Sequence, residues 1–181
     1  QRFGNRATYI FNMHVNPANI CAMNCTFCNY AASPTAPHAY VMEENEILDN
    51  VERLQPTEVH IVGGLNRVWP YARNLALVRE LRKRFPDLYI KAYTAVEIDY
   101  FARTSGRGEA EILAELKVAG MDAMPGGGAE IFSERLWQQH WKNKIGPNDW
   151  IKIHRLAHGM DIPTNATMLF GFGESWPERI A

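Results

Sequence analysis

The chain has 181 residues, 46% of them hydrophobic and 22% charged, which is enough for one domain with a real core. Its formal net charge of −1 gives no reason to expect a nucleic acid or an anionic membrane surface as a partner, and no apolar run is long enough to span a membrane. No signal peptide is visible and the three cysteines form no disulfide pattern, so we expect a cytoplasmic protein.

Strands and helices alternate along the first half of the chain. β-branched and aromatic residues predict a strand at 8–11, and the loop after it carries all three cysteines. Apolar residues at helical spacing predict helices at 43–54 and 70–85, on either side of a strand at 58–62. We expect His60 in that strand to be a satisfied core histidine, and His14 to belong to the cysteine-bearing loop.

The alternation continues through the second half. The sequence predicts the following elements in order: a strand at 88–94, a helix at 109–119, a strand at 121–124, helical sequence from Ala129, a helix at 149–159 and a strand at 162–170. Repeated strand–helix units indicate an α/β fold with parallel strands. Because no G-x-G-x-x-G opens the first helix, a dinucleotide-binding sheet is disfavoured.

A partial (β/α) TIM-type barrel, with about five parallel βα units, is therefore the predicted fold. Five strands do not close a barrel, so we expect residues 1–181 to form one partial-barrel domain that is truncated at both ends. In such barrels the active site collects on the loops that follow the strands. We expect four such loops on one face: the cysteine loop, Gly63–Gly64, Gly126–Gly128 and Gly171–Glu174.

The cysteine loop carries the clearest chemical signal. Cys21, Cys25 and Cys28 lie within eight residues, and three thiolates at this spacing can hold a 4Fe–4S cluster that leaves one iron without a protein ligand. A zinc site would need a fourth ligand, such as His14 or His38. A Cys-x-x-Cys redox pair would leave Cys21 unexplained, and an odd number of cysteines argues against disulfides.

The pattern Cys21-x-x-x-Cys25-x-Phe27-Cys28 resembles the signature of the radical S-adenosylmethionine (radical SAM) enzymes. Gly63–Gly64 and the G-F-G-E sequence at 171–174 resemble later elements of that superfamily, in the same order.

Longer stretches, among them Thr94–Glu97 and Glu130–Phe132, are similar to the aminofutalosine synthases of menaquinone biosynthesis. They are less similar to the related dehypoxanthine futalosine cyclases and deazaflavin-forming enzymes. Two positions differ, because Asn66 and Phe172 stand where that family usually has histidine.

The resemblance implies a cofactor site. Cys21, Cys25 and Cys28 are expected to hold the 4Fe–4S cluster, and S-adenosylmethionine is expected to bind the open iron and to release a 5′-deoxyadenosyl radical. The residues implied in contact with S-adenosylmethionine are Phe27, Gly63, Gly64 and Glu174. An electron donor such as flavodoxin or ferredoxin is implied as a partner.

The resemblance also implies a small-molecule substrate, 3-[(1-carboxyvinyl)oxy]benzoate, to which the radical adds to give aminofutalosine. The implied substrate-binding residues are Glu97, Gly126, Gly127, Gly128, Glu130 and Asn165. The glycine run precedes an expected helix start at Ala129, whose free N–H groups suit a carboxylate. Glu97 and Glu130 could instead cap a helix or face solvent, and no catalytic residue is assigned. A non-catalytic iron–sulfur or zinc module is the alternative of another class.

Overall fold

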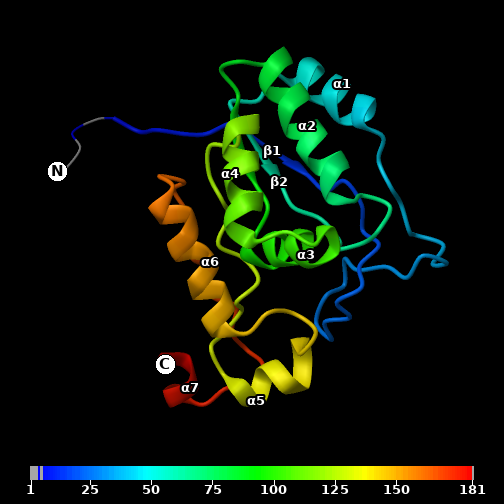
Figure 1. Ribbon diagram of the computed structural model, residues 1–181. Coiled ribbons are helices and arrows are strands. Elements are labelled where there is room, and N and C mark those ends of the chain that lie inside the picture. Colours follow the sequence, from blue (N-terminus) through cyan, green and yellow to red (C-terminus); the bar gives the residue numbers. More distant parts are fainter. Residues whose placement is uncertain (1–3, 5, 181) are drawn as a thin grey trace.

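The computed structural model describes residues 4 and 6–180. Three parallel strands, β1 (Asn12–Val15), β2 (Glu58–Ile61) and β3 (Tyr89–Ala92), form a sheet in the order β1-β2-β3. Helices cross over between them and cover one face of the sheet (Figure 1). The prediction of an α/β fold with a partial barrel of parallel strands is confirmed.

The helices follow the strands in chain order. Between β1 and β2 lies α1 (Glu44–Leu54), and between β2 and β3 lies α2 (Tyr71–Arg84). Both confirm the predicted helices. After β3 the remaining helices are α3 (Ala95–Ser105), α4 (Glu109–Ala119), α5 (Glu134–Leu136), the π-helix η1 (Trp137–Trp141), α6 (Pro147–Gly159) and α7 (Trp176–Ile180).

The predicted first strand at 8–11 is wrong by four residues. Tyr9 and Ile10 are 92% and 66% exposed, whereas Val15, at the end of β1, is buried. The carbonyl of Phe11 accepts a hydrogen bond from the Thr57 N–H at 2.9 Å, immediately before the ladder between β1 and β2 begins. The prediction rested on the strand propensity of Tyr9 and Ile10, but these exposed side chains are not packed in the core.

The predicted fourth and fifth strands are present only as single bridges. Lys91 pairs with Ala123, and Met124 pairs with Thr164, both in parallel orientation. Proline interrupts each segment next to its bridge, at Pro125 and Pro163. Because proline has no N–H to donate, neither segment can extend into a ladder there.

Helix α3 was not predicted, although the sequence contains its start signal. The Thr94 side chain accepts a hydrogen bond from the Glu97 N–H, and the Glu97 carboxylate accepts one from the Thr94 N–H, which is a complete capping box. Gly106 ends the helix in a left-handed conformation at φ 70°.

The core lies between the sheet and the helices. Side chains from alternate strand positions, Val59 and Ile61 on β2 and Ile90 on β3, are fully buried there. Each such side chain stabilises the fold by about 1.5–3 kcal/mol. Helix α4 packs against α2, α3 and α6 and so joins the helical layer into one body.

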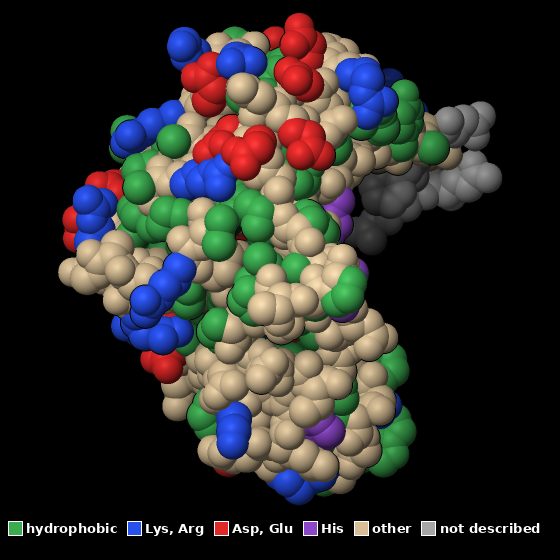
Figure 2. Space-filling view, turned by 90° about the vertical axis from the view of Figure 1, so that its right-hand side faces the viewer, with side chains coloured by type: hydrophobic (Ala, Val, Ile, Leu, Met, Phe, Trp, Pro, Cys, Tyr) green, Lys and Arg blue, Asp and Glu red, His purple; other side chains and the backbone are tan. Residues whose placement is uncertain are grey.

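No helix among the described residues combines the length and apolar character needed to cross a membrane. Figure 2 shows acidic and basic side chains intermixed over the end of the molecule that carries α1 and α2.

Candidate functional site

The cysteine loop leaves the C-terminal end of β1. Cys21, Cys25 and Cys28 lie in irregular chain between β1 and α1, all three are free thiols, and all three are partly buried. Burial raises the pKa of the Cys25 thiol, and the Lys144 ammonium opposes that rise. Because it follows the C-terminal end of β1, the cysteine loop lies at the edge of the sheet where the active sites of α/β barrels collect.

The donor set fits a three-cysteine iron–sulfur cluster better than a single ion. No three His, Cys, Asp or Glu side chains of the described chain are arranged to hold one metal ion. A 4Fe–4S cubane makes a different demand, because each cysteine binds a different iron and the sulfurs lie farther apart than ligands of one ion. The buried Nε2 of His140, beside this loop, has no hydrogen-bond partner among the described residues. A bound group commonly satisfies such an atom.

The loop after β2 holds the segment that leads into the cysteines. The Gly64 N–H donates to the Ala18 carbonyl at 2.8 Å. A Cβ on Gly64 would lie 2.2 Å from the carbonyl oxygen of Ile20, so no side chain fits there. Gly63 is less tight, with its nearest contact at 3.2 Å from Pro17. The glycine pair thus has a packing role that is independent of the predicted contact with S-adenosylmethionine, which stays a prediction.

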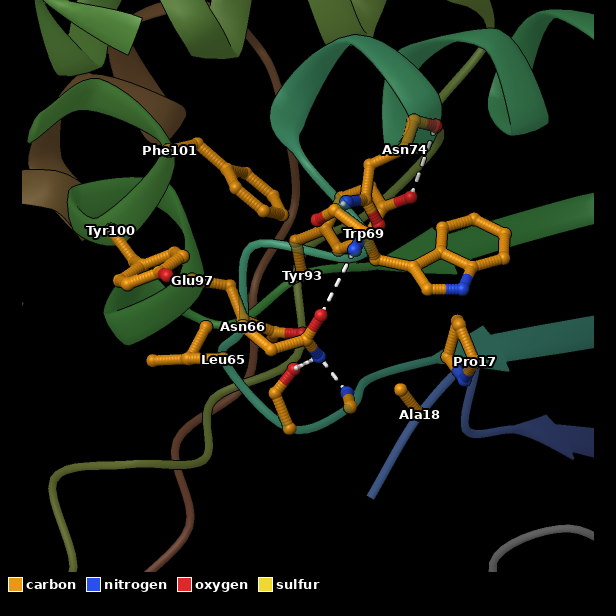
Figure 3. A pocket seen from close by; sticks show the side chains of 12 residues that line it. Pro17, Ala18, Leu65, Asn66, Trp69, Asn74, Tyr93, Glu97, Tyr100 and Phe101 are labelled. Atoms are coloured by element: carbon orange, nitrogen blue, oxygen red, sulfur yellow. Dashed lines mark hydrogen bonds between the residues drawn. The ribbon is translucent and has the colours of Figure 1, made fainter. Parts of the chain in front are cut away.

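Asn66 completes this contact. Its Nδ2 donates to the carbonyls of Ile20 at 3.1 Å and Gly64 at 2.8 Å, and its Oδ1 accepts from the N–H groups of Val68 and Trp69. Figure 3 shows Asn66 and Trp69 in a small pocket between this loop and α3. Every polar atom of this amide is satisfied by backbone groups of the loop after β2 and of the cysteine loop, so Asn66 has a structural role at this position.

A second contact to the cysteine loop comes from η1 and the residues after it. The Thr26 N–H donates to the His140 carbonyl at 3.0 Å, and the Thr26 hydroxyl bonds Nδ1 of the same histidine at 2.7 Å. The Asn143 side chain donates to the Met23 carbonyl at 3.0 Å. We call Thr26, His140, Asn143 and Met23 the η1 clamp. Short π-helices are frequent at functional sites.

Phe27 lies in an aromatic cluster. Its ring centroid is 5.7 Å from that of Trp141 and 5.1 Å from that of Phe172, and the Lys144 ammonium sits 5.3 Å from the Phe27 ring centroid. The second departure from the family pattern, Phe172, thus packs directly on the residue between two cysteines. Cys25 packs against the same cluster.

Glu130 forms an ion pair with Lys144, and both side chains are nearly buried, at 13% and 9% exposed. Glu130 adopts a left-handed backbone conformation at φ 57°, which is unusual for a residue with a side chain. Through Lys144 the pair is linked to Phe27, so the structure brings Glu130 to the cysteine loop. Its predicted role in substrate binding stays a prediction.

Glu97 lies inside the protein. It is 6% exposed and accepts hydrogen bonds from the Gly63 N–H at 3.1 Å, the Thr94 N–H at 2.7 Å and the Thr94 hydroxyl at 2.8 Å. Burial raises its pKa to about 7, against the opposing effect of these donors. Of the roles considered for Glu97, the structure shows the helix cap and not a solvent-facing side chain, and it adds a hydrogen bond from the Gly63 N–H.

The run Gly126–Gly128 does not lead into a helix at Ala129. Helix α5 begins only at Glu134, so the predicted helix start is wrong, and with it the argument for a carboxylate at a helix N-terminus. Instead the run packs against Asn165, whose carbonyl would lie 1.6 Å from a Cβ on Gly126. A substrate role for these glycines and for the exposed Asn165 stays a prediction.

Glu174 stabilises its own loop. Its carboxylate accepts from the N–H groups of Gly171 and Phe172 and pairs with Arg179. Hydrogen bonds from backbone N–H groups and from Arg179 lower its pKa to about 2. By holding this loop, Glu174 positions Phe172 against Phe27. Its predicted contact with S-adenosylmethionine stays a prediction.

Two histidines that we expected elsewhere lie together on the open face of the sheet. His14 is in β1 rather than in the loop, and its ring centroid is 5.1 Å from that of His60. His60 points away from the helices, so its predicted place in the core is wrong. The alternation Glu58-Val59-His60-Ile61 carried this signal, because residues two apart share a face.

Fold and cysteine loop together define a class of protein. Residues 15–181 match the Radical SAM superfamily, and the chain belongs to that superfamily. The FeFe-hydrogenase maturase HydG from Carboxydothermus hydrogenoformans has the same fold, with a TM-score of 0.65 at 16% identity over 90% of this chain and 37% of that chain.

Curated relatives narrow the comparison. The chain is 40% identical to an aminodeoxyfutalosine synthase of Thermus thermophilus, over 99% of this chain and 49% of the relative. It is 33% identical to a 5-amino-6-(D-ribitylamino)uracil–L-tyrosine 4-hydroxyphenyl transferase of Methanopyrus kandleri, over 95% and 47%. It is 32% identical to a cyclic dehypoxanthine futalosine synthase of Halalkalibacterium halodurans, over 95% and 47%. The chain thus spans about half the length of these relatives.

Proposed function

We propose that this chain is part of a radical SAM transferase that joins the 5′-deoxyadenosyl group to 3-[(1-carboxyvinyl)oxy]benzoate and gives aminofutalosine. The observation that carries the proposal is the 40% identity to an aminodeoxyfutalosine synthase over 99% of the chain. It is supported by the cysteine loop at the C-terminal end of β1. Addition would occur at the enol-ether double bond, and rearrangement with loss of the carboxylate as carbon dioxide would release one electron again. S-adenosylmethionine is thereby consumed, with methionine as its other product.

The residues of this chain would act by holding and shielding. Cys21, Cys25 and Cys28 would hold the 4Fe–4S cluster, which together with S-adenosylmethionine supplies a 5′-deoxyadenosyl radical when bound. Phe27 and Phe172 would keep water from that side of the site. The loop after β2 and the η1 clamp would keep the three thiols in place.

A low-potential electron donor such as flavodoxin or ferredoxin is the partner that this chemistry needs. Three free thiols also need reducing surroundings, so we place the protein in the cytoplasm.

Reaction products distinguish this function from its nearest rival, the cyclase reaction for which the Halalkalibacterium halodurans relative is named. The full-length protein, reconstituted and reduced under anaerobic conditions, is incubated with S-adenosylmethionine and the enolpyruvyl benzoate. We expect mass spectrometry to show a product that carries the adenosyl group. Release of 5′-deoxyadenosine with no adenosylated product would show that the synthase assignment is wrong.

Metal analysis separates the enzyme from a zinc module. We expect about four iron and four sulfide per chain after reconstitution. About one zinc with no labile sulfide would contradict a radical mechanism altogether.

A further inference from the structure

The face of the sheet turned away from the helices is polar. Along β2, Val59 and Ile61 face the core, so Glu58 and His60 face the other way. Barrel interiors are normally filled with branched apolar side chains. An interior face that carries ionisable groups therefore needs an explanation other than packing.

Three of these groups form one row across the sheet. His14 is in register with His60, and His60 is in register with Lys91. Each is the residue before the last of its strand, so the row is the inward-facing layer nearest the C-terminal ends of the strands. That is also the edge from which the cysteine loop departs.

The row has a positive charge with no opposite charge bound to it. None of the ion pairs formed among the described residues involves Lys91. The groups that act on His60 from the neighbouring strands and its own are His14, Lys91 and Glu58. Glu58 lies one layer lower and accepts a hydrogen bond from the Asn12 side chain.

Burial lowers the pKa of His60, and His14 and Lys91 lower it further. A neutral imidazole still has one N–H to donate, and Lys91 provides the fixed charge.

There is room for a ligand beside the row. A cavity of about 480 Å³ is lined by Lys91 of this row, though not by His14 or His60, and by residues that include Glu58, Tyr89, Met124, Thr164 and Asn165. The Glu58 carboxylate in this wall already accepts the hydrogen bond from the Asn12 side chain. This volume is in the range of pockets that bind small molecules. Asn165, predicted from the sequence as a substrate-binding residue, lies in the wall of this cavity.

We propose that His14, His60 and Lys91 form a binding site for a carboxylate of the substrate. The inference rests on the proposed function, which supplies a substrate with two carboxylates, and it replaces the helix N-terminus that the fold does not form at Ala129. A single ammonium with imidazole N–H donors suits a singly charged carboxylate. A metal ion is disfavoured because lysine is not a usual ligand.

Binding to the full-length, cluster-loaded protein tests this site. Isothermal titration measures the affinity for the enolpyruvyl benzoate, for benzoate and for benzamide, which is the neutral counterpart of benzoate. We expect Lys91→Met to weaken the binding of both acids by about tenfold or more. It should also remove the preference for benzoate over benzamide. Lys91→Arg keeps the charge and should retain most of that preference. The control is Lys83→Met on α2, whose side chain is 79% exposed and which should change nothing.

Each outcome decides the proposal. Unchanged acid binding in a folded Lys91→Met protein, an equal loss for benzoate and benzamide, or no binding of either acid by the wild type would overturn the carboxylate site. If Lys91→Met fails to fold, Lys91→Arg is compared with Lys91→Gln instead. Lys91→Arg should prefer benzoate over benzamide more strongly than Lys91→Gln does, and an equal preference would overturn the site.

The proposed function fails separately. If the wild-type protein binds benzoate through Lys91 but forms no adenosylated product, the carboxylate site is supported and the synthase assignment is wrong. If Lys91→Met binds and converts the substrate as the wild type does, the synthase assignment is supported and the carboxylate site is wrong.

Discussion

Gly64 lies in close contact with the segment that leads into the cysteines. A Cβ there would meet the Ile20 carbonyl at 2.2 Å, and backbone atoms cannot yield as a flexible side chain does. We expect Gly64→Ala to destabilise the protein by about 1–3 kcal/mol and to lower the iron bound per chain, because the loop must shift. Thermal unfolding and iron analysis measure the two effects.

The control for this substitution is Gly159→Ala at the end of α6, where nothing lies within 4 Å of the added carbon. It should leave iron content unchanged. Equal iron in Gly64→Ala and wild type would show that the contact does not position the cysteines.

Glu97 gives a prediction for pH dependence. Its pKa is raised from 4.5 to about 7 by burial, so the folded state favours the protonated acid. The stabilisation from this proton is complete below pH 4.5 and is lost as the pH rises toward 7 and above. We expect the free energy of unfolding to fall by roughly 2–3 kcal/mol more in wild type than in Glu97→Gln between pH 5 and pH 8.

Urea unfolding at the two pH values measures this difference. A wild-type protein that becomes more stable than Glu97→Gln at pH 8 would show that the three donors around the carboxylate outweigh its burial.

At this scale the sequence was informative where the signal is local. The cysteine spacing and the Gly63–Gly64 pair could be recognised because a few adjacent residues carry them. The depth of Glu97 could not, since the Gly63 loop and the start of α3 enclose it only after folding. The same holds for Lys144, which meets Phe27 from a distant part of the chain.

Among the elements, η1 has a defined task. It holds the cysteine loop through Thr26 and, with the residue Asn143 that follows it, through the Met23 carbonyl. We expect Asn143→Ala to speed the loss of iron to a chelator several-fold with less than about 1 kcal/mol change in unfolding free energy, because only one neutral hydrogen bond is lost.

Gln138→Ala is the matched control within η1, since Gln138 is exposed and bonds only Glu134 among the described residues. Iron release that is equal in the two variants would mean that the η1 clamp does not retain the cluster.

Elements were predicted well where periodic apolar residues and stop signals agree, as in α2 and α4. Helix α3 was missed although Thr94 and Glu97 carry its capping box, because Thr94 is also the last residue of the predicted strand at 88–94. The π-helix has no comparable signal in the sequence of residues 137–141.

In the whole molecule, Arg82 joins three parts of the chain. Its guanidinium donates to the carbonyls of Leu88 at 2.9 Å and Gly120 at 2.8 Å and pairs with Asp122. These bonds connect α2, the start of β3 and the end of α4. We expect Arg82→Met to cost about 2–3 kcal/mol, because several carbonyls lose a charged donor at once.

Urea unfolding with Arg84→Met as the control tests this. Arg84 pairs only with Glu80 on the same helix among the described residues, so its loss should cost less than about 0.5 kcal/mol. Equal costs would show that Arg82 contributes no more than a surface ion pair.

The class of fold was predictable because strands and helices alternate along the whole chain. The side chains on the inward face of the sheet could not be predicted in the same way. The row of His14, His60 and Lys91 depends on strand register, and the register depends on β1 beginning at Asn12 rather than four residues earlier. The reduction of the last two strands to single bridges likewise depends on Pro125 and Pro163 in their three-dimensional setting.

The η1 clamp has a consequence for protein synthesis. Met23 and Asn143 are 120 residues apart, so the ribosome has made the cysteines long before the residue that secures their loop. At 5–20 residues per second the interval is about 6–24 s. During that time the three thiols are on a nascent chain whose loop is anchored only on the β2 side. Cluster insertion that precedes release from the ribosome must therefore act on a loop that is still half open.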